Sequence, residues 1–129
     1  YLGAFGPGKG EGMYAGVSFV ASSPEPGVQE FVSKIRKNAG EDAVVSFYVM
    51  THYNSLIALK GGLEKAGKVD REALIDGMEG LSFEIPTGAA SITKDDHHTA
   101  MNMYIAKTEN GTLNVAKELG IIEPAPQCA

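Results

Sequence analysis

The sequence predicts an α/β fold with three helices, short strands and a C-terminal β-hairpin. Apolar residues recur at helical spacing through the middle of the chain, from about residue 24 to residue 80. Beyond residue 80 they alternate with polar residues, which is the period of a strand. The dipeptide Asn110-Gly111 separates two alternating runs and is a strong hairpin signal. These three observations set the fold class.

A glycine-rich loop and a strand precede the first predicted helix. The loop spans Gly3 to Gly12, and Met13 to Val20 has the composition of a strand. We expect a helix from about Pro24 to Gly40, because Ser and Pro residues suit a helix start and glycine suits its end. Its apolar positions follow three-and-four spacing: Val28, Phe31, Val32, Ile35 and Ala39.

A longer helix is expected from about Val45 to a stop at Gly67. Its first part would also fit a short strand, but one apolar stripe continues without a phase break and favours a helix. Gly61 and Gly62 lie inside the helix, which suggests a close helix contact or a bend. The predicted stripe consists of Val45, Val49, His52, Leu56, Leu59, Leu63 and Ala66.

A third helix is predicted after Asp70, a good cap residue, and should end near Gly80. Short strands are then expected at residues 81–85 and 89–93. The hairpin around Asn110-Gly111 follows, with alternation at residues 101–106 and again at 113–115.

Composition restricts the classes of partner. The 129 residues suit one domain, and no apolar run approaches the roughly 20 residues that a membrane span needs. The net charge is −5 and the basic residues are scattered, which argues against nucleic acid as a partner. The single cysteine, Cys128, fits either a free thiol or a disulfide with another part of an exported protein.

Six segments, taken in order, resemble the last third of type I periplasmic solute-binding proteins that serve importers of branched-chain amino acids and short-chain amides. They are distributed along nearly the whole chain: Glu11–Tyr14, Phe31–Gly40, Tyr53–Gly67, Phe83–Gly88, Asp95–His98 and Asn110-Gly111. Tyr53–Gly67 closes with Leu-Glu-Lys-Ala-Gly, similar to the "LE.AG" helix end of that family.

The resemblance implies a C-terminal fragment of a two-lobed, non-enzymatic receptor. Such a receptor binds a small amino acid or amide between its lobes and delivers it to a membrane permease of an ABC importer. The implied location is the periplasm, or the outer surface of a Gram-positive cell. Residues 1–20 would be the crossover between lobes, 24–80 the helical segment, 81–118 the strands and hairpin, and 119–129 a tail. A fragment of this kind would expose apolar helix faces and could self-associate.

Four residues are candidates for solute binding. Tyr48, Thr51 and His52 share one side of the first turns of the long helix, where free N–H groups and the helix dipole suit a polar ligand. The alternative is that His52 is a core histidine on the apolar stripe and that Tyr48 packs at the rim. Tyr14, in the crossover, would touch the solute or support the hinge; support is the favoured interpretation.

The sequence Asp95-Asp96-His97-His98 is the one cluster with metal-ligand chemistry. Adjacent side chains of an extended segment diverge, so we expect no metal site and no cofactor. Two other functions stay open: a ligand-sensing regulator of the same fold, and a small metal-dependent hydrolase that would also need His52.

Overall fold

The computed structural model describes residues 9–125. Residues 3–8 of the loop expected at Gly3 to Gly12, the start of the predicted crossover and Cys128 therefore lie outside the described residues. The described elements follow the order β1 (Tyr14–Val17), α1 (Pro26–Ala39), α2 (Phe47–Ala66), α3 (Arg71–Met78), β2 (Ser82–Ile85), β3 (Gly88–Ile92), β4 (Thr99–Glu109) and β5 (Thr112–Ile122). The mixed α/β class with three helices is confirmed.

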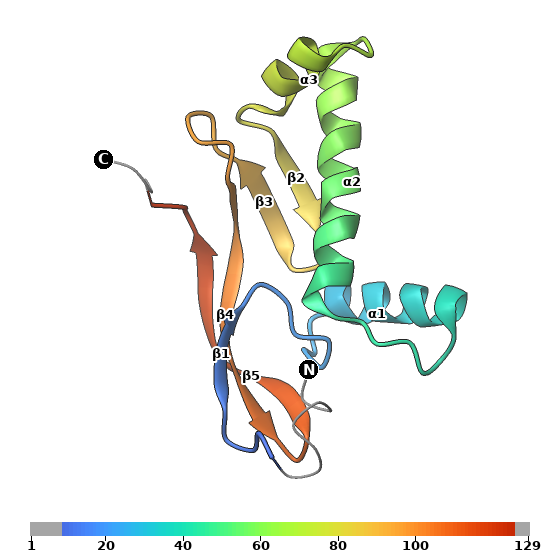
Figure 1. The fold of residues 1–129 in the computed structure, drawn as a ribbon, viewed down its shortest axis with the longest axis vertical. Helices are drawn as coiled ribbons and strands as arrows, with labels where there is room; N and C mark the ends of the chain where they lie inside the picture. Colours follow the sequence, from blue (N-terminus) through green and yellow to red (C-terminus); the bar gives the residue numbers. More distant parts are fainter. Residues whose placement is uncertain (1–8, 126–129) are drawn as a thin grey trace.

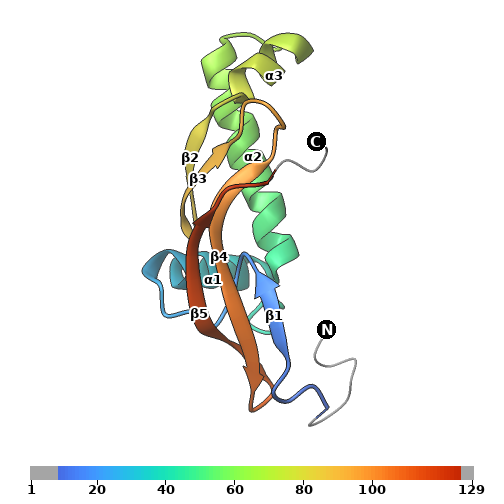
Figure 2. The ribbon, with the colours of Figure 1, turned by 90° about the vertical axis from the view of Figure 1, so that its left-hand side faces the viewer.

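The described strands form one antiparallel sheet of five strands. β4 pairs with three other strands. β5 pairs along one edge of β4, while β1 and β3 pair with different parts of its other edge. β2 pairs with β3. Figure 1 shows α2 standing beside β2 and β3, with α3 near its far end and α1 crossing at its foot. Figure 2, turned by 90°, shows the long β4–β5 ribbon curving past the helices.

The core lies where α1, the start of α2 and the segment after β1 meet. Phe19 packs edge-on against Phe31 with ring centroids 5.8 Å apart, and Val28, Val45 and Met50 complete the contact. β1 ends at Val17, so Phe19 belongs to the connection that follows the strand. The predicted strand through Val20 was therefore too long, although its apolar end is buried as a core residue would be.

The first helix begins at Pro26 rather than near Pro24. Glu25 has φ −57° and ψ 129°, which are not helical values, so Glu25 is the residue that precedes the helix.

The carboxylate of Glu25 accepts a hydrogen bond from the buried hydroxyl of Tyr104 at 2.9 Å. Burial, this hydrogen bond and the nearby charge of Glu118 raise the pKa of the Tyr104 hydroxyl well above its usual value. The helix start is thus tied to β4.

The predicted apolar stripe of α2 is wrong in its middle part, whereas Val45 is buried and Val49, Leu63 and Ala66 are partly buried. The buried residues of the helix are Met50, Asn54, Ala58 and Gly62, whereas His52, Leu56 and Leu59 are exposed. The helix is apolar on more than one side, so periodicity alone did not distinguish the face that packs within this chain. Its stop was predicted correctly: Gly67 has φ 68° and closes the helix by donating to the carbonyl of Leu63 at 2.9 Å.

Glycines allow α2 and α3 to approach closely, as the sequence suggested. A Cβ on Gly62 would stand 2.5 Å from Cγ of Met78, and a Cβ on Gly77 would stand 2.5 Å from the carbonyl oxygen of Gly62. The Asp70 side chain caps α3 by accepting from the Ala73 N–H at 3.0 Å, which confirms the predicted cap.

The hairpin turn is confirmed at Asn110-Gly111. Asn110 has φ 53° and Gly111 has φ 72°, as a two-residue turn with both central residues in the left-handed region requires. Glu11 accepts from both backbone N–H groups, at 2.9 Å and 3.3 Å, and so joins the start of the described chain to this turn. β5 continues to Ile122, into the segment expected as a tail.

Candidate functional site

The start of α2 leaves its first backbone donors without a side-chain cap. Ser46 is the cap residue, with φ −97° and ψ 170°, but its hydroxyl makes no capping hydrogen bond. The first turn contains no acidic residue. The first N–H groups of a helix have no partner within the helix, so this end is suited to an acceptor group on a ligand.

Polar side chains on the first turns of α2 bend back to the helix backbone. The Thr51 hydroxyl donates to the carbonyl of Phe47 at 2.9 Å, and Nδ1 of His52 lies 2.7 Å from the carbonyl oxygen of Tyr48. A carbonyl oxygen can only accept, so Nδ1 is the protonated nitrogen in this contact. In the neutral ring, Nε2 is then an acceptor on an exposed side chain. Because the His52 side chain is exposed on the helix, His52 is not a core histidine within this chain.

An aromatic pair lies beside these groups. The ring centroids of Phe47 and Tyr48 are 4.0 Å apart with an angle of 32° between the ring planes. Tyr48 is 48% exposed, so about half of its surface faces solvent. Phe47 was not singled out from the sequence, because an aromatic residue at a helix start is equally typical of a core position.

A groove of about 700 Å³ reaches the start of α2. Its lining includes Val17 at the end of β1, Ser46 and Phe47 at the helix start, and Leu113 on β5. Arg36, Glu41 and Asp42 bring charge to its wall. Residues from three distant parts of the sequence meet here, which is why no local pattern predicted the groove.

Asn54 is a second residue that the sequence pattern missed. Its side chain is buried on α2, and neither atom of its amide group has a hydrogen-bond partner among the described residues. A buried amide normally has partners. A polar residue inside a helical stretch gives no sequence signal for burial, so only the packing reveals it.

Tyr14 lies apart from the other three candidates, on β1 rather than α2. Tyr14 is 64% exposed, and Nζ of Lys107 lies 5.8 Å from the centroid of its ring. Lys107 is also its neighbour in the β1–β4 register. The structure thus groups Tyr48, Thr51 and His52 on one helix and gives Tyr14 a partner on β4.

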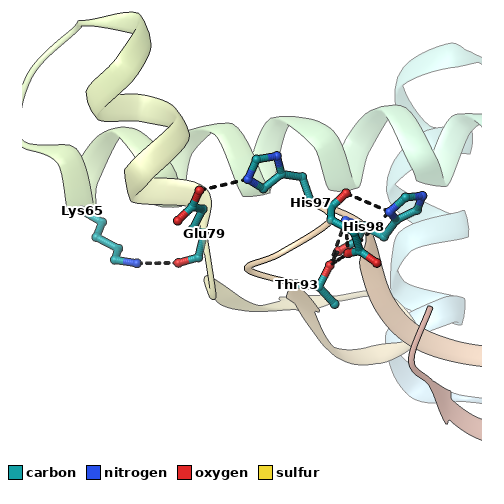
Figure 3. Close-up of polar contacts among 6 residues, drawn as sticks. Lys65, Glu79, Thr93, His97 and His98 are labelled. Carbon is teal, nitrogen blue, oxygen red and sulfur yellow. Dashed lines mark hydrogen bonds and ion pairs between the residues drawn. The ribbon is translucent and has the colours of Figure 1, made fainter. Parts of the chain in front are cut away.

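The histidine pair occupies the turn between β3 and β4 (Figure 3). Nε2 of His97 lies 3.0 Å from Oε1 of Glu79, whose backbone carbonyl accepts from Lys65 at 2.9 Å. Nδ1 of His98 lies 2.9 Å from the backbone carbonyl of Asp96. The two rings have different partners, and no group of three or more metal-ligating side chains occurs within residues 9–125.

The Asp96 carboxylate organises the same turn. It accepts from the Thr93 hydroxyl and from the backbone N–H of His98, the latter at 3.2 Å. The hydrogen bond from Thr93 is the larger cause of a lowered pKa of Asp96, and that from the His98 backbone is the next. These contacts give the aspartate-histidine turn a structural explanation.

Comparison with known proteins identifies the family of this chain. A family model described as periplasmic binding protein matches residues 1–112. The chain belongs to the periplasmic binding protein family. The match and the relatives described next identify its type I class and its branched-chain amino acid branch. Among residues 9–125, no helix is both long and apolar enough to cross a membrane.

Relatives within this family are several-fold longer than the chain. The Leu/Ile/Val-binding protein homolog 6 of Brucella abortus is 27% identical over 105 residues, which are 78% of this chain and 27% of that protein. A solute-binding protein of an ABC transporter from Rhodopseudomonas palustris BisB5, solved with 3,4-dihydroxybenzoic acid, is 28% identical with a TM-score of 0.74. The match covers 88% of this chain and 31% of that one.

A third match shows the fold alone. The leucine-, isoleucine-, valine-, threonine- and alanine-binding protein of Brucella ovis, in its closed conformation, has a TM-score of 0.79 at 18% identity. It covers 99% of this chain, whereas this chain covers 37% of it. The backbone arrangement is therefore that of a segment found in full-length binding proteins.

Proposed function

We propose that this chain supplies one wall of the solute site in a binding protein of an ABC importer. The start of α2 would form that wall, with Tyr48, Thr51 and His52 facing the solute. The observation that supports the proposal most directly is the exposed, uncharged and partly aromatic surface of these first turns, next to a groove of about 700 Å³. An uncharged polar surface of this kind suits a small organic molecule.

The solute would be small and would carry both polar and apolar groups. Uncapped N–H groups at the helix start suit a carboxylate or an amide oxygen, and the face of Tyr48 suits an apolar or aromatic group. Amino acids, short amides and aromatic acids all combine these features. The names of the relatives support a panel of such compounds, since one is a homolog of a Leu/Ile/Val-binding protein and another was solved with 3,4-dihydroxybenzoic acid.

Tyr14 would support the wall rather than contact the solute. Its ring has Lys107 as a partner, and its strand pairs with β4.

After binding, the receptor would dock on a membrane permease in the periplasm or at the outer cell surface. Its role would be binding and delivery, without a chemical reaction, as in the binding proteins to which it is similar.

Tyr48→Ala in the intact receptor tests the proposal. Calorimetric titration should show a Kd at least tenfold weaker for the preferred solute, because a large apolar side chain buried by a ligand contributes about 1.5–3 kcal/mol. Circular dichroism should be unchanged, since Tyr48 is exposed in this chain. Tyr14→Ala is the matched control and should change affinity much less. Unchanged affinity in Tyr48→Ala would remove this helix from the site.

A further inference from the structure

The turn between β4 and β5 contains a chemically labile pair of residues. Asn110 is the only asparagine of the chain that a glycine follows. Asparagine is one of the thermolabile residues, because the backbone nitrogen of the next residue can attack its side-chain carbonyl carbon. Glycine in that next position has no side chain to hinder the attack. Asn110 and Gly111 are both exposed, so water reaches the pair.

The reaction at such a pair changes the backbone as well as the side chain. The Gly111 nitrogen forms a bond to the side-chain carbonyl carbon of Asn110. The bond from that carbon to the amide nitrogen breaks, and the amide nitrogen leaves as ammonia with the proton that Gly111 gives up. Water then opens the resulting five-membered imide ring at either carbonyl, which yields aspartate or isoaspartate at position 110. Water is the only reactant besides the chain itself.

In the folded protein, the nitrogen that would attack is held by a hydrogen bond. The Glu11 carboxylate accepts from the Asn110 N–H at 2.9 Å through Oε1 and from the Gly111 N–H at 3.3 Å through Oε2. The attack requires a rotation about the Cα–C bond of Asn110, which would break the hydrogen bond from Gly111. The contact with Glu11 therefore favours the unreactive form of the turn.

We propose that Asn110 is a site of spontaneous deamidation and that the Glu11 carboxylate slows this reaction while it remains on the turn. The rate then follows the fraction of time in which the contact is open, because a hydrogen-bonded segment reacts through local opening. This inference concerns a covalent modification and does not depend on solute binding.

Deamidation would in turn weaken the contact that slows it. The aspartate form places a new carboxylate next to Glu109 in the sequence and in the same turn that Glu11 contacts. The nearby Lys107 already pairs with Glu109, with Nζ 2.8 Å from Oε1. Like charges at short range repel, so Glu11 would leave the turn more often. The isoaspartate form adds a backbone atom, which a two-residue turn does not accommodate in the same register.

Release of Glu11 would reach the sheet, because Glu11 leads into β1. The Gly12 N–H donates to the carbonyl of Thr108 at 2.9 Å, and the Thr108 N–H donates to the carbonyl of Met13 at 2.9 Å. β1 begins directly after Met13. Figures 1 and 2 both show the start of the described chain beside the turn that joins β4 and β5. We therefore expect the modification to loosen the first contacts between the chain before β1 and the end of β4.

Peptide mapping by mass spectrometry measures the conversion of Asn110 during incubation of the intact protein, without solute, at mildly alkaline pH. Glu11→Gln keeps the size of the side chain but leaves one acceptor oxygen and no charge. It should speed the conversion about three- to tenfold, because one net hydrogen bond changes an opening equilibrium by about that factor. Glu109→Gln is the matched control, since it removes the same charge from a side chain that pairs with Lys107. Its rate should stay within about twofold of the parent rate, because an exposed ion pair contributes little.

Two further measurements separate the folded contact from other effects. In urea, the parent and Glu11→Gln should convert at equal rates, because the contact exists only in the folded state. Asn114, which no glycine follows, should convert much more slowly than Asn110 in both. Asn110→Asp reproduces the aspartate product and should speed hydrogen exchange of the Gly12 and Thr108 amides severalfold.

Four results would overturn the proposal. Equal rates for folded Glu11→Gln and the folded parent would show that the contact does not slow the reaction. A slower rate in Glu11→Gln would show that the carboxylate promotes the attack as a base. Equal acceleration by Glu109→Gln would assign the effect to charge alone. Conversion of Asn110 no faster than that of Asn114, in urea as in the folded protein, would remove the site.

Discussion

Replacing Gly77 by alanine should destabilise the protein, although alanine is the better helix former. Gly77 lies in the last turn of α3, where its missing side chain lets the helix backbone approach α2. A Cβ at this position would stand 2.5 Å from the carbonyl oxygen of Gly62 and 3.4 Å from Cβ of Ala66. The first of these distances is too short for any Cβ contact, and the atom it meets belongs to a backbone that cannot rotate away.

The magnitude follows from two opposing terms. Alanine in place of glycine stabilises a helix by up to about 1 kcal/mol. Overpacking a close contact costs about 1–3 kcal/mol, and the upper part of that range applies when a backbone must move. Separating the helices would also weaken the packing of Leu74 and Met78 against Gly62. We therefore expect a net loss of about 1–2 kcal/mol.

Urea unfolding followed by circular dichroism measures this loss. For a domain of this size the midpoint should fall by about 0.5–1 M. Gly61→Ala is the matched control, because its Cβ would meet Cδ2 of Leu81 at 3.1 Å, the movable end of a side chain. That variant should be neutral or gain up to about 1 kcal/mol. If Gly77→Ala were as stable as Gly61→Ala, the close approach of α2 and α3 would be refuted.

Two further predictions concern local hydrogen bonds. Asp70→Ala should lower the free energy of unfolding by about 1 kcal/mol, because it removes the cap of α3. Asp76→Ala on the same helix is the control. An equal loss in both variants would contradict a capping role. Thr93→Val should raise the pKa of Asp96 toward 3.8, measured by NMR titration of the carboxylate, because the largest cause of the lowered pKa is removed. A lowered carboxylate pKa stabilises the fold above about pH 3.8 and ceases to do so as the pH falls through the folded-state pKa, so this variant should lose less stability in acid.

Local chemistry allowed the helix ends and the hairpin to be predicted from the sequence. Gly67 ends α2 and Asp70 caps α3, because each acts on backbone groups within a few residues of itself. Asn110-Gly111 makes its turn for the same reason, since few residues tolerate two successive positive φ angles. The groups at the start of α2 could also be named in advance, and their role in solute binding stays a prediction.

Tertiary structure decided which side of α2 is buried. An apolar periodicity shows that a face needs a partner, but in a helix without charges over residues 47–59 two faces satisfy that condition. Gly62 settled the choice, because only a face with glycine admits α3 at such close range, and so Asn54 is buried while Leu56 is exposed. The hydrogen bonds that the Glu11 carboxylate accepts from the distant hairpin turn could not be predicted from the sequence for a related reason. Contacts between residues far apart in the sequence depend on how elements pack, and no local pattern records that packing.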